Sequence, residues 1–253
     1  MKKTLIVTGA SSGMGREFAL TLSKKLQPEE VWLVSRNEEK LKAVSKDIDV
    51  PCVLISTDLG TDEGLERLFA ELEDRKPDCI CLVNAAGFGK FGNFESIALK
   101  DQQEMIALNC TALMSICYRV GEYMGEGSCI YNLGSLSSFQ PVPYINTYGA
   151  TKAFVLSFSR ALNKEWKKRK IKVMAVSPGW VKTDFFNRAV KDDTIKYYNK
   201  FFTSEQVIKR AVRDMEKSKD VSVCGFSIRA QVLACKILPH KLVMAIWCSQ
   251  QKK

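Results

Sequence analysis

The stretch Thr8–Gly15, with the sequence TGASSGMG, directly follows the apolar run Thr4–Thr8 at the start of the chain. Gly9, Gly13 and Gly15 have the spacing G-x-x-x-G-x-G, and the residues after them are typical of a helix. Glycines in a strand-to-helix turn let the backbone approach a diphosphate, which the first amides of the helix can bind. Glycines also occur in ordinary loops, but the position between strand and helix favours a phosphate-binding turn.

Short runs rich in β-branched residues alternate with amphipathic segments along the rest of the chain. The runs predict seven strands, at residues 4–8, 31–35, 52–57, 79–84, 128–133, 172–177 and 221–224. The amphipathic segments predict helices, for example at residues 15–26, 38–47, 63–74 and 100–124. Apolar strands separated by helices are typical of a parallel sheet covered on both faces. We therefore predict that residues 1–253 form a single α/β domain, a Rossmann-type doubly wound parallel sheet of about seven strands with helices on both faces.

The histidine and cysteine content argues against several kinds of site. His240 is the only histidine, so a hydrolytic triad or a multi-histidine metal site would depend on that residue alone. None of the nine cysteines forms a C-x-x-C pair, and several lie in apolar runs such as Cys79–Val83. This usage is typical of buried, reduced thiols. We therefore expect no metal site.

The chain carries a net charge of +10, and its densest basic cluster is Lys164–Lys172. These cations would lie at the end of a helix, where they favour the negative end of the helix dipole. A solvated helix end explains the cluster better than nucleic-acid binding, and a docking patch for an acidic carrier protein is a third alternative. No apolar run approaches the roughly 18 residues of a membrane span. We therefore expect a cytoplasmic protein that binds no nucleic acid and does not contact a membrane.

Ser35 and Arg36 lie about 20 residues beyond the glycine turn, at the expected end of the second strand. Enzymes that prefer NAD have an acidic residue at this distance, which binds the ribose 2′-hydroxyl. A serine beside a guanidinium would instead accept a 2′-phosphate. An exposed arginine at a strand end is the alternative interpretation. The pair therefore favours NADP(H) over NAD(H).

Tyr148 and Lys152 are four residues apart, so they share one face of a helix, and Ser135 precedes them by thirteen residues. An isolated tyrosine, with a pKa of about 10, is a poor proton donor or acceptor near neutrality. A nearby ammonium favours the phenolate and lowers that pKa. Ser135 can hydrogen-bond the same substrate oxygen. Together with the glycine turn, this pattern predicts proton transfer to or from a carbonyl or alcohol oxygen.

These motifs resemble the short-chain dehydrogenase/reductase family, in its large branch with TGxxxGxG and YxxxK motifs. The resemblance runs from Thr4 to about Thr183. The matching residues, in chain order, are Thr8–Gly15, Asp58, Leu59, Asn84–Gly87, Asn109, Ser135, Tyr148, Lys152 and Pro178–Thr183. The resemblance implies hydride transfer between a nicotinamide nucleotide and a carbonyl or secondary alcohol, with no metal.

The resemblance also implies how the cofactor binds. Asp58 would contact the adenine, Asn84 would line the cofactor cleft, and Val181 and Thr183 would hold the nicotinamide carboxamide. The expected cofactor-binding residues are Gly9, Ser11, Ser12, Gly13, Met14, Gly15, Ser35, Arg36, Asp58, Leu59, Asn84, Ala85, Tyr148, Lys152, Pro178, Gly179, Val181 and Thr183. Ser12 departs from many NADP-preferring relatives, which have a basic residue just before the second glycine. Arg36 would then hold the 2′-phosphate largely alone.

Four residues are expected to be catalytic: Asn109, Ser135, Tyr148 and Lys152. Tyr148 would be the general acid or base, and Ser135 and Tyr148 would together hold the reacting oxygen. By the resemblance, Lys152 would keep the tyrosine acidic and bond the nicotinamide ribose. Asn109 would distort its helix and anchor a water that links Lys152 to solvent protons.

Two segments interrupt the alternation of strands and helices and are rich in aromatic residues. They are the loop Phe88–Phe94 and a substrate loop at about residues 180–203. Loops at the carboxyl ends of parallel strands bind ligands, although these aromatics could simply pack the insertion onto the domain. With Phe139, Pro141 and Tyr144 they predict an apolar pocket for a hydrophobic ketone, such as a steroid or a long-chain acyl group. The resemblance to family members implies a substrate of the hydroxysteroid or 3-oxoacyl type.

The segment at residues 230–248 is apolar, and Pro239 divides it into two short helices at most. It could close the substrate site, pack against a second subunit, or rest on a membrane surface, of which the last is the least favoured. Because family members are usually dimers or tetramers, we expect a homodimer or homotetramer. Two other functions stay open: a carrier-protein-linked 3-oxoacyl reductase that uses the basic cluster, and a non-catalytic NADPH-binding sensor.

Overall fold

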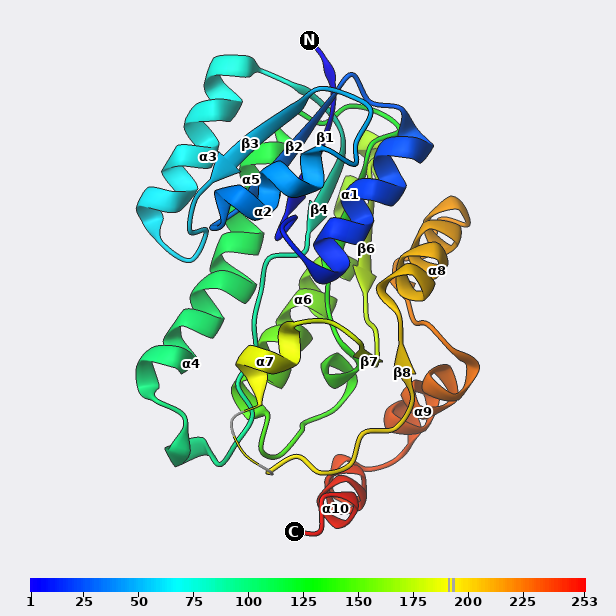
Figure 1. Ribbon diagram of the computed structural model, residues 1–253. Helices are drawn as coiled ribbons and strands as arrows, with labels where there is room; N and C mark the ends of the chain where they lie inside the picture. The colour runs from blue at the N-terminus through cyan, green and yellow to red at the C-terminus, as the bar shows by residue number, and fades with distance from the viewer. Residues whose placement is uncertain (191, 193) are drawn as a thin grey trace.

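The computed structural model describes residues 1–190, 192 and 194–253, and its centre is a seven-stranded parallel sheet (Figure 1). The strand order is β3-β2-β1-β4-β5-β6-β9. These strands are β1 (Lys3–Thr8), β2 (Glu30–Ser35), β3 (Cys52–Ser56), β4 (Asp78–Asn84), β5 (Cys129–Leu133), β6 (Lys172–Val176) and β9 (Val221–Ser222). The predicted parallel sheet is confirmed. Strand order reverses between β1 and β4, and ligands bind outside the carboxyl ends of such sheets at this point.

Helices cover both faces of the sheet (Figure 1). They are α1 (Gly13–Leu26), α2 (Glu38–Ser45), α3 (Asp62–Arg75), α4 (Leu99–Ile106), α5 (Leu113–Gly121), α6 (Asn146–Glu165), α7 (Phe185–Ala189), α8 (Ser204–Glu216), α9 (Phe226–Ile237) and α10 (His240–Gln250). One apolar core joins the sheet to α1, α2, α8 and α9. A second core joins the other face to α3, α5 and α6. The strands inside the sheet are therefore buried from both sides, whereas the edge strand β3 is only partly buried. Burial on both faces explains why the inner strands lack polar alternation.

The helix predicted over residues 100–124 is interrupted. The structure has α4, then a π-helical turn at Ala107–Ala112, then α5, which ends at Gly121. Asn109 lies in the π turn, and its side chain bonds both backbone polar groups of Phe88. The expected helix distortion at Asn109 is confirmed. A π turn widens the helix locally, and such turns are frequent at functional sites.

The insertion that begins at Trp180 has structure of its own. Two short strands, β7 (Trp180–Val181) and β8 (Phe201–Phe202), pair in parallel, with α7 between them. The part of the predicted substrate loop at residues 191 and 193 lies outside the described residues. Trp180 packs edge-on against Tyr198, with ring centroids 4.9 Å apart. Aromatic packing therefore fixes this segment above the carboxyl ends of the strands.

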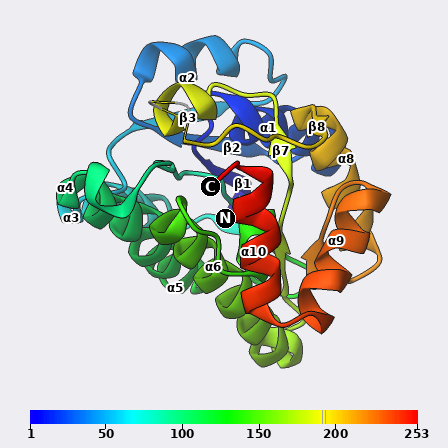
Figure 2. The same cartoon turned by 90° about the horizontal axis from the view of Figure 1, so that it is seen from below.

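The C-terminal segment forms two helices, as Pro239 predicts. Figure 2 shows α10 lying across the end of the molecule, between α6 and α9 in that view. Trp247 donates a 3.0 Å hydrogen bond to the carbonyl of Pro143, and buried Gln251 accepts from the amides of Lys196 and Tyr197. These bonds hold α10 against the insertion. In the described part of the chain, no helix is both long and apolar enough to cross a membrane.

Candidate active site

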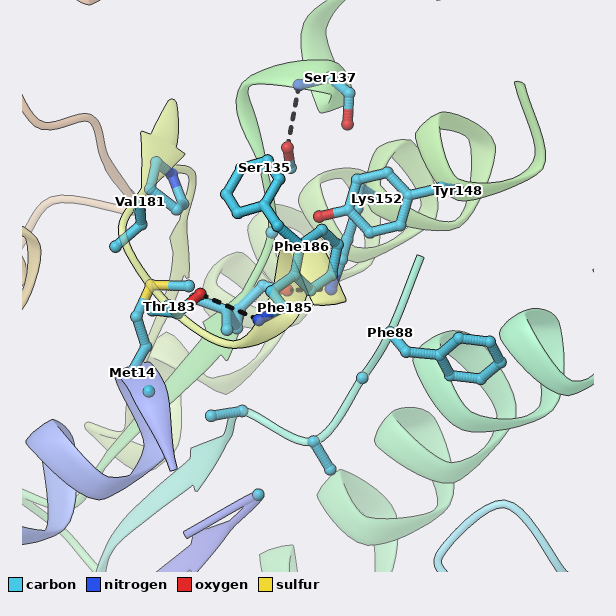
Figure 3. A pocket seen from close by; sticks show the side chains of 18 of the residues that line it. Met14, Phe88, Ser135, Ser137, Tyr148, Lys152, Val181, Thr183, Phe185 and Phe186 are labelled. Atoms are coloured by element: carbon cyan, nitrogen blue, oxygen red, sulfur yellow. Dashed lines mark hydrogen bonds between the residues drawn. The ribbon is translucent and has the colours of Figure 1, made fainter. Parts of the chain in front are cut away.

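A cavity of about 680 Å³ opens at the carboxyl edge of the sheet, and Figure 3 shows the side chains around part of it. All expected cofactor-binding residues line the cavity except Asn84, and all expected catalytic residues line it except Asn109. The topology therefore brings residues from 9 to 183 into one site.

The glycine turn is shaped by close contacts between backbone segments. Gly9 has a φ of +66°, and a Cβ added to it would lie 2.7 Å from the amide nitrogen of Ala86. A Cβ on Gly15 would lie 2.2 Å from the carbonyl oxygen of Gly9. Any side chain at either position would therefore force the turn, β4 and α1 apart.

The start of α1 fits an anion. Ser12 is its N-cap residue, yet the Ser12 side chain makes no capping hydrogen bond, and the first turn contains no acidic residue. The first amides of α1 are therefore free to bind a diphosphate, and the positive end of the helix dipole favours one. Ser11–Gly15 line the cavity at this point. These residues fit the diphosphate of a dinucleotide.

The end of β2 supplies polar groups for the ribose. The Ser35 hydroxyl is buried and has no hydrogen-bond partner, and it lines the cavity. The Arg36 guanidinium lies 3.6 Å from the Asp58 carboxylate, with both side chains about half exposed. Lys40, in the first turn of α2, lines the same end of the cavity. The sequence analysis missed Lys40, although its place one helical turn beyond Arg36 was a usable signal.

Asn84 and Asn109 lie behind the cavity wall. Asn84 is 2% exposed and donates a 2.9 Å hydrogen bond to Asn132 on the neighbouring strand β5. This position differs from the cofactor cleft expected for it, because the side chain at the end of β4 points along the sheet. Asn109 is 1% exposed and donates to Thr151, which in turn donates to the carbonyl of Tyr148. Asn109 therefore supports the helix that carries Tyr148.

Ser135, Tyr148 and Lys152 meet on one wall of the cavity (Figure 3). Ser138 links them: its hydroxyl accepts from the amide of Ser135 and donates a 2.8 Å bond to the carbonyl of Lys152. The Lys152 ammonium donates a 2.7 Å bond to the carbonyl of Leu133, at the end of β5. Ser138, which the sequence analysis did not identify, thus fixes the turn that carries Ser135 against α6.

Aromatic rings cover the Tyr148 side chain. The ring of Phe185 lies 5.6 Å from that of Tyr148, and the ring of Phe91 lies 5.9 Å from it. Figure 3 shows Phe185 and Phe186 beside Tyr148, whereas the ring of Phe88 points away. Phe185 and Phe186 also pack against each other, so the insertion both covers the site and is held by its own aromatic contacts. These rings therefore pack against one another and also line the cavity.

Residues beyond position 194 form the outer wall of the cavity. Tyr197 and Asn199 come from the insertion, Gln231 from α9, and Trp247 and Gln250 from α10. The C-terminal segment therefore closes part of the pocket, which was one of the three roles considered for it. Periodicity gave no signal for these positions, because their approach to the site depends on packing between distant segments.

Comparison with known proteins agrees with this geometry. A model of the family described as "short chain dehydrogenase" matches residues 3–194. The chain belongs to the short-chain dehydrogenase family. As a member it is an oxidoreductase that acts on CH–OH or C=O groups with a nicotinamide nucleotide.

Named relatives of this dehydrogenase differ in what they act on. A human 3-oxoacyl-[acyl-carrier-protein] reductase is 30% identical over 198 residues, covering 78% of this chain and 82% of the relative. A serine 3-dehydrogenase from Agrobacterium fabrum is 31% identical over 191 residues, covering 73% and 74%. A short-chain dehydrogenase from Sphingobium yanoikuyae, solved in complex with NADPH, has a TM-score of 0.78, with 26% identity and coverage of 96% and 95%.

Burial controls the proton affinities of the dehydrogenase's central pair. Burial raises the pKa of Tyr148 to about 12, and the hydrogen bond with Ser135 lowers it only in part. Burial lowers the pKa of Lys152 to about 8. The expected acidification of Tyr148 by Lys152 is not seen in the protein alone, because the ammonium bonds Leu133 and lies 5.7 Å from the centre of the Tyr148 ring. A protonated Tyr148 is suited to donate a proton.

These pKa values predict a pH dependence. If Tyr148 is the proton donor and Lys152 its charged partner, ketone reduction needs a protonated Tyr148, which is present below about pH 12, and a charged Lys152, which is lost as the pH rises through about 8. We expect kcat/KM for reduction to be level between pH 6 and 7.5 and to fall above about 8, whereas alcohol oxidation rises with pH. Circular dichroism at each pH controls for unfolding. A reduction profile that stays level to pH 10 would contradict this assignment.

Proposed function

We propose that this chain is an NADP(H)-dependent reductase of hydrophobic ketones, acting as one dinucleotide-binding domain with residues 180–203 as its substrate loop. The principal observation is that Ser135, Tyr148 and Lys152 face a cavity that is continuous with the glycine turn. Such a cavity can hold a nucleotide and a carbonyl compound side by side, which hydride transfer requires.

The mechanism follows from the positions of the side chains. A bound nicotinamide nucleotide supplies the hydride for reduction or accepts it for oxidation. Tyr148 donates its proton to the carbonyl oxygen, and Ser135 donates a hydrogen bond to the same oxygen. We propose that Lys152, which bonds the carbonyl of Leu133 in the protein alone, approaches Tyr148 during turnover and then stabilises the tyrosinate that proton transfer leaves behind. Asn109, through Thr151, holds the backbone that carries Tyr148.

The aromatic contacts support a hydrophobic substrate. Phe91, Phe185 and Phe186 lie around Tyr148, and Trp247 closes the cavity from the C-terminal side. These rings exclude water from the reacting carbonyl, which strengthens the hydrogen bonds to its oxygen. We propose a bulky ketone of the hydroxysteroid or 3-oxoacyl type as the substrate.

Substitution of Tyr148 tests the mechanism directly. We expect Tyr148→Phe to lower kcat by roughly a hundredfold or more, because general acid catalysis typically contributes 10²–10⁴-fold. NADPH oxidation is followed against steroid ketones, 3-oxoacyl thioesters and small aldehydes, with NADH in parallel. NADPH binding, measured by nucleotide fluorescence, stays within a few-fold in the variant because the glycine turn is untouched.

Two outcomes would count against the proposal. Near-normal turnover by Tyr148→Phe would exclude Tyr148 as the proton donor. Tight NADPH binding by the wild-type chain, with turnover of no compound in the panel, would favour the non-catalytic sensor. Turnover of small polar carbonyls alone would exclude the hydrophobic substrate.

The carrier-protein alternative depends on the cluster Lys164–Lys172 lying near the pocket. Arg169 instead donates to the carbonyls of Gly121 and Met124, and the amide of Gly127 bonds the carbonyl of Lys170. Strand β6 begins at Lys172, so this cluster lies at the amino edge of the sheet, opposite the cavity. A carrier docked there would not deliver its acyl chain to Tyr148. We therefore favour a free ketone.

We propose NADP(H) as the preferred nucleotide because two cations, Arg36 and Lys40, line the cavity beyond Ser35. Arg36 therefore has a second cation close by, unlike the expectation that it acts largely alone. A 2′-phosphate would replace Asp58 as the partner of Arg36, and it would accept from the unpaired Ser35 hydroxyl.

Charge removal tests this preference. We expect Arg36→Ala and Lys40→Ala each to weaken NADPH binding about tenfold, since a hydrogen bond to a charged group is worth roughly 1.5–3 kcal/mol and this site is partly exposed. NADH binding changes little. Lys42→Ala is the matched control, because Lys42 lies on the same helix but pairs with Glu38 and Glu39. Equal losses for both nucleotides would contradict a 2′-phosphate site.

We propose that the chain forms a homodimer through α4, α5 and α6. Ile106, Met114 and Tyr118 follow one another along α4 and α5 as an exposed apolar stripe, and Tyr118 is 71% exposed. Phe154 and Phe158 stack on the adjacent helix α6, with ring centroids 5.7 Å apart. Exposed apolar surface of this kind is characteristic of subunit contacts.

The dimer is tested by light scattering after size-exclusion chromatography. We expect the wild-type chain to be at least dimeric and Tyr118→Glu to be monomeric, because the buried charge would lose its water. Leu233→Glu is the control, because Leu233 is exposed and apolar on α9. A monomeric wild type would exclude a homo-oligomer, and dissociation by Leu233→Glu alone would move the interface to the C-terminal helices.

The nine free cysteines support a reducing compartment, and we propose the cytoplasm. The sulfur atoms of Cys81 and Cys129, on neighbouring strands, are 3.6 Å apart. Burial raises the pKa of the Cys79 and Cys117 thiols, which keeps them protonated and unreactive.

A further inference from the structure

The outer wall of the cavity contains a group of neutral amides that hydride transfer does not use. They are Gln140, Asn199 and Gln231, called here the distal amide site. Two of the three lie beyond residue 194, where the match to the family model ends. We therefore expect these amides to recognise the substrate that is particular to this chain. This expectation rests on the proposed ketone reductase.

Asn199 has an unsatisfied polar atom. Its NH₂ group donates a long, 3.4 Å hydrogen bond to the side-chain oxygen of Gln231, while its own oxygen Oδ1 is buried without a partner. Turning the amide over would bury the NH₂ group unpaired instead. In either orientation, one polar atom of Asn199 needs a partner, and Asn199 lines the cavity. A buried polar atom left unpaired costs roughly 1–3 kcal/mol, so a ligand that pairs it gains affinity.

The other two amides are held in place by α9. Cys235, one turn after Gln231, donates a hydrogen bond to the side-chain oxygen of Gln140. Gln140 directly follows the short 3₁₀ helix Leu136–Phe139, which has Ser135 as its N-cap. The NH₂ groups of Gln140 and Gln231 are not used in these bonds. The distal amide site therefore offers both acceptors and donors, and it is connected to the catalytic serine by a short stretch of chain.

The distribution of charged residues around the cavity limits which chemical group the distal amide site can bind. The cations that line the described cavity are Arg36 and Lys40 at the nucleotide end and Lys152 beside Tyr148. None of them belongs to the outer wall, where the amides are joined by Tyr197, Trp247 and Gln250. A carboxylate or phosphate buried here would lack a counter-charge, whereas a neutral hydroxyl both donates to an amide oxygen and accepts from an amide NH₂ group.

We propose that the distal amide site binds a hydroxyl group that the substrate carries far from its reacting carbonyl. The substrate is then a bulky apolar hydroxyketone, whose ring system contacts the aromatic wall and whose hydroxyl pairs with Asn199. An unsubstituted hydrocarbon end placed at this site would leave the Asn199 oxygen unpaired. Sites built to bond a substrate hydroxyl discriminate strongly against analogues that lack it.

The experiment uses two pairs of steroid ketones with the full-length protein and NADPH. One pair is a saturated 3-ketone with and without a 17β-hydroxyl, and the other is a 17-ketone with and without a 3-hydroxyl. We expect the wild type to favour the hydroxylated member of the productive pair by roughly tenfold to a hundredfold in kcat/KM. Asn199→Leu should bring this ratio close to one by slowing only the hydroxyketone.

Gln231→Leu, on a different element, is the second variant, and we expect it to reduce the same ratio. Asn187→Leu is the matched control, because Asn187 is exposed on α7 and does not line the cavity. It should leave the ratio unchanged. Thermal unfolding of each variant shows whether it is folded.

The outcomes separate this inference from the proposed function. Equal kcat/KM for both members of each pair in the wild type, or an equal loss for both in Asn199→Leu, would overturn the distal amide site while leaving the reductase intact. If no ketone is turned over, the reductase fails, and binding is measured instead by quenching of tryptophan fluorescence, since Trp247 lines the cavity. Tighter binding of the hydroxylated steroids, lost in Asn199→Leu, would then support the site; equal binding would overturn it.

Discussion

The buried ammonium of Lys152 is the constraint on which the rest of the site depends. A cation removed from water is costly unless polar groups surround it, and the lowered pKa of Lys152 reflects that cost. The carbonyl of Leu133 at the end of β5 compensates part of the charge. The Tyr148 ring also lies near the ammonium, with its centre 5.7 Å from Nζ. Lys152 does not lower the pKa of Tyr148 in the protein alone, so the fold itself bears the cost of burying the lysine.

The two ends of the cavity are built from different kinds of contact. At the nucleotide end, backbone approaches backbone, and Gly9 and Gly15 have no room for a side chain. The Thr8 hydroxyl fixes this geometry by accepting from the amides of Ala85 and Ala86. At the substrate end, side chains from α7, α9 and α10 form the wall. Substrate preference can therefore change by substitution there without disturbing the phosphate-binding turn.

The sequence predicted the sheet well because the inner strands are buried on both faces, so the apolar run of each one is a local signal. It also placed the residues of the glycine turn and of the Tyr148 helix, whose spacing is fixed by one turn or one helix. Asn84 was expected in the cofactor cleft, but its direction depends on Asn132, a residue 48 positions away. Asn199 was missed for the same reason, because only tertiary contacts bring it to the cavity, whereas Lys40 could have been found from its position four residues beyond Arg36.

Hydrogen bonds join the insertion to the C-terminal helix α10, and both segments form the outer wall of the cavity. Gln251 is fully buried, and its side chain bonds backbone groups of Lys196 and Tyr197 at three points. The segment that bears Asn199 is thereby tied to the end of α10, and Trp247 ties α10 to Pro143 beside the catalytic helix. Displacing the insertion alone would leave the Gln251 amide unpaired in an apolar setting, which is costly. Separating the insertion from α10 would therefore break these hydrogen bonds, and the two segments form this part of the outer wall as one unit.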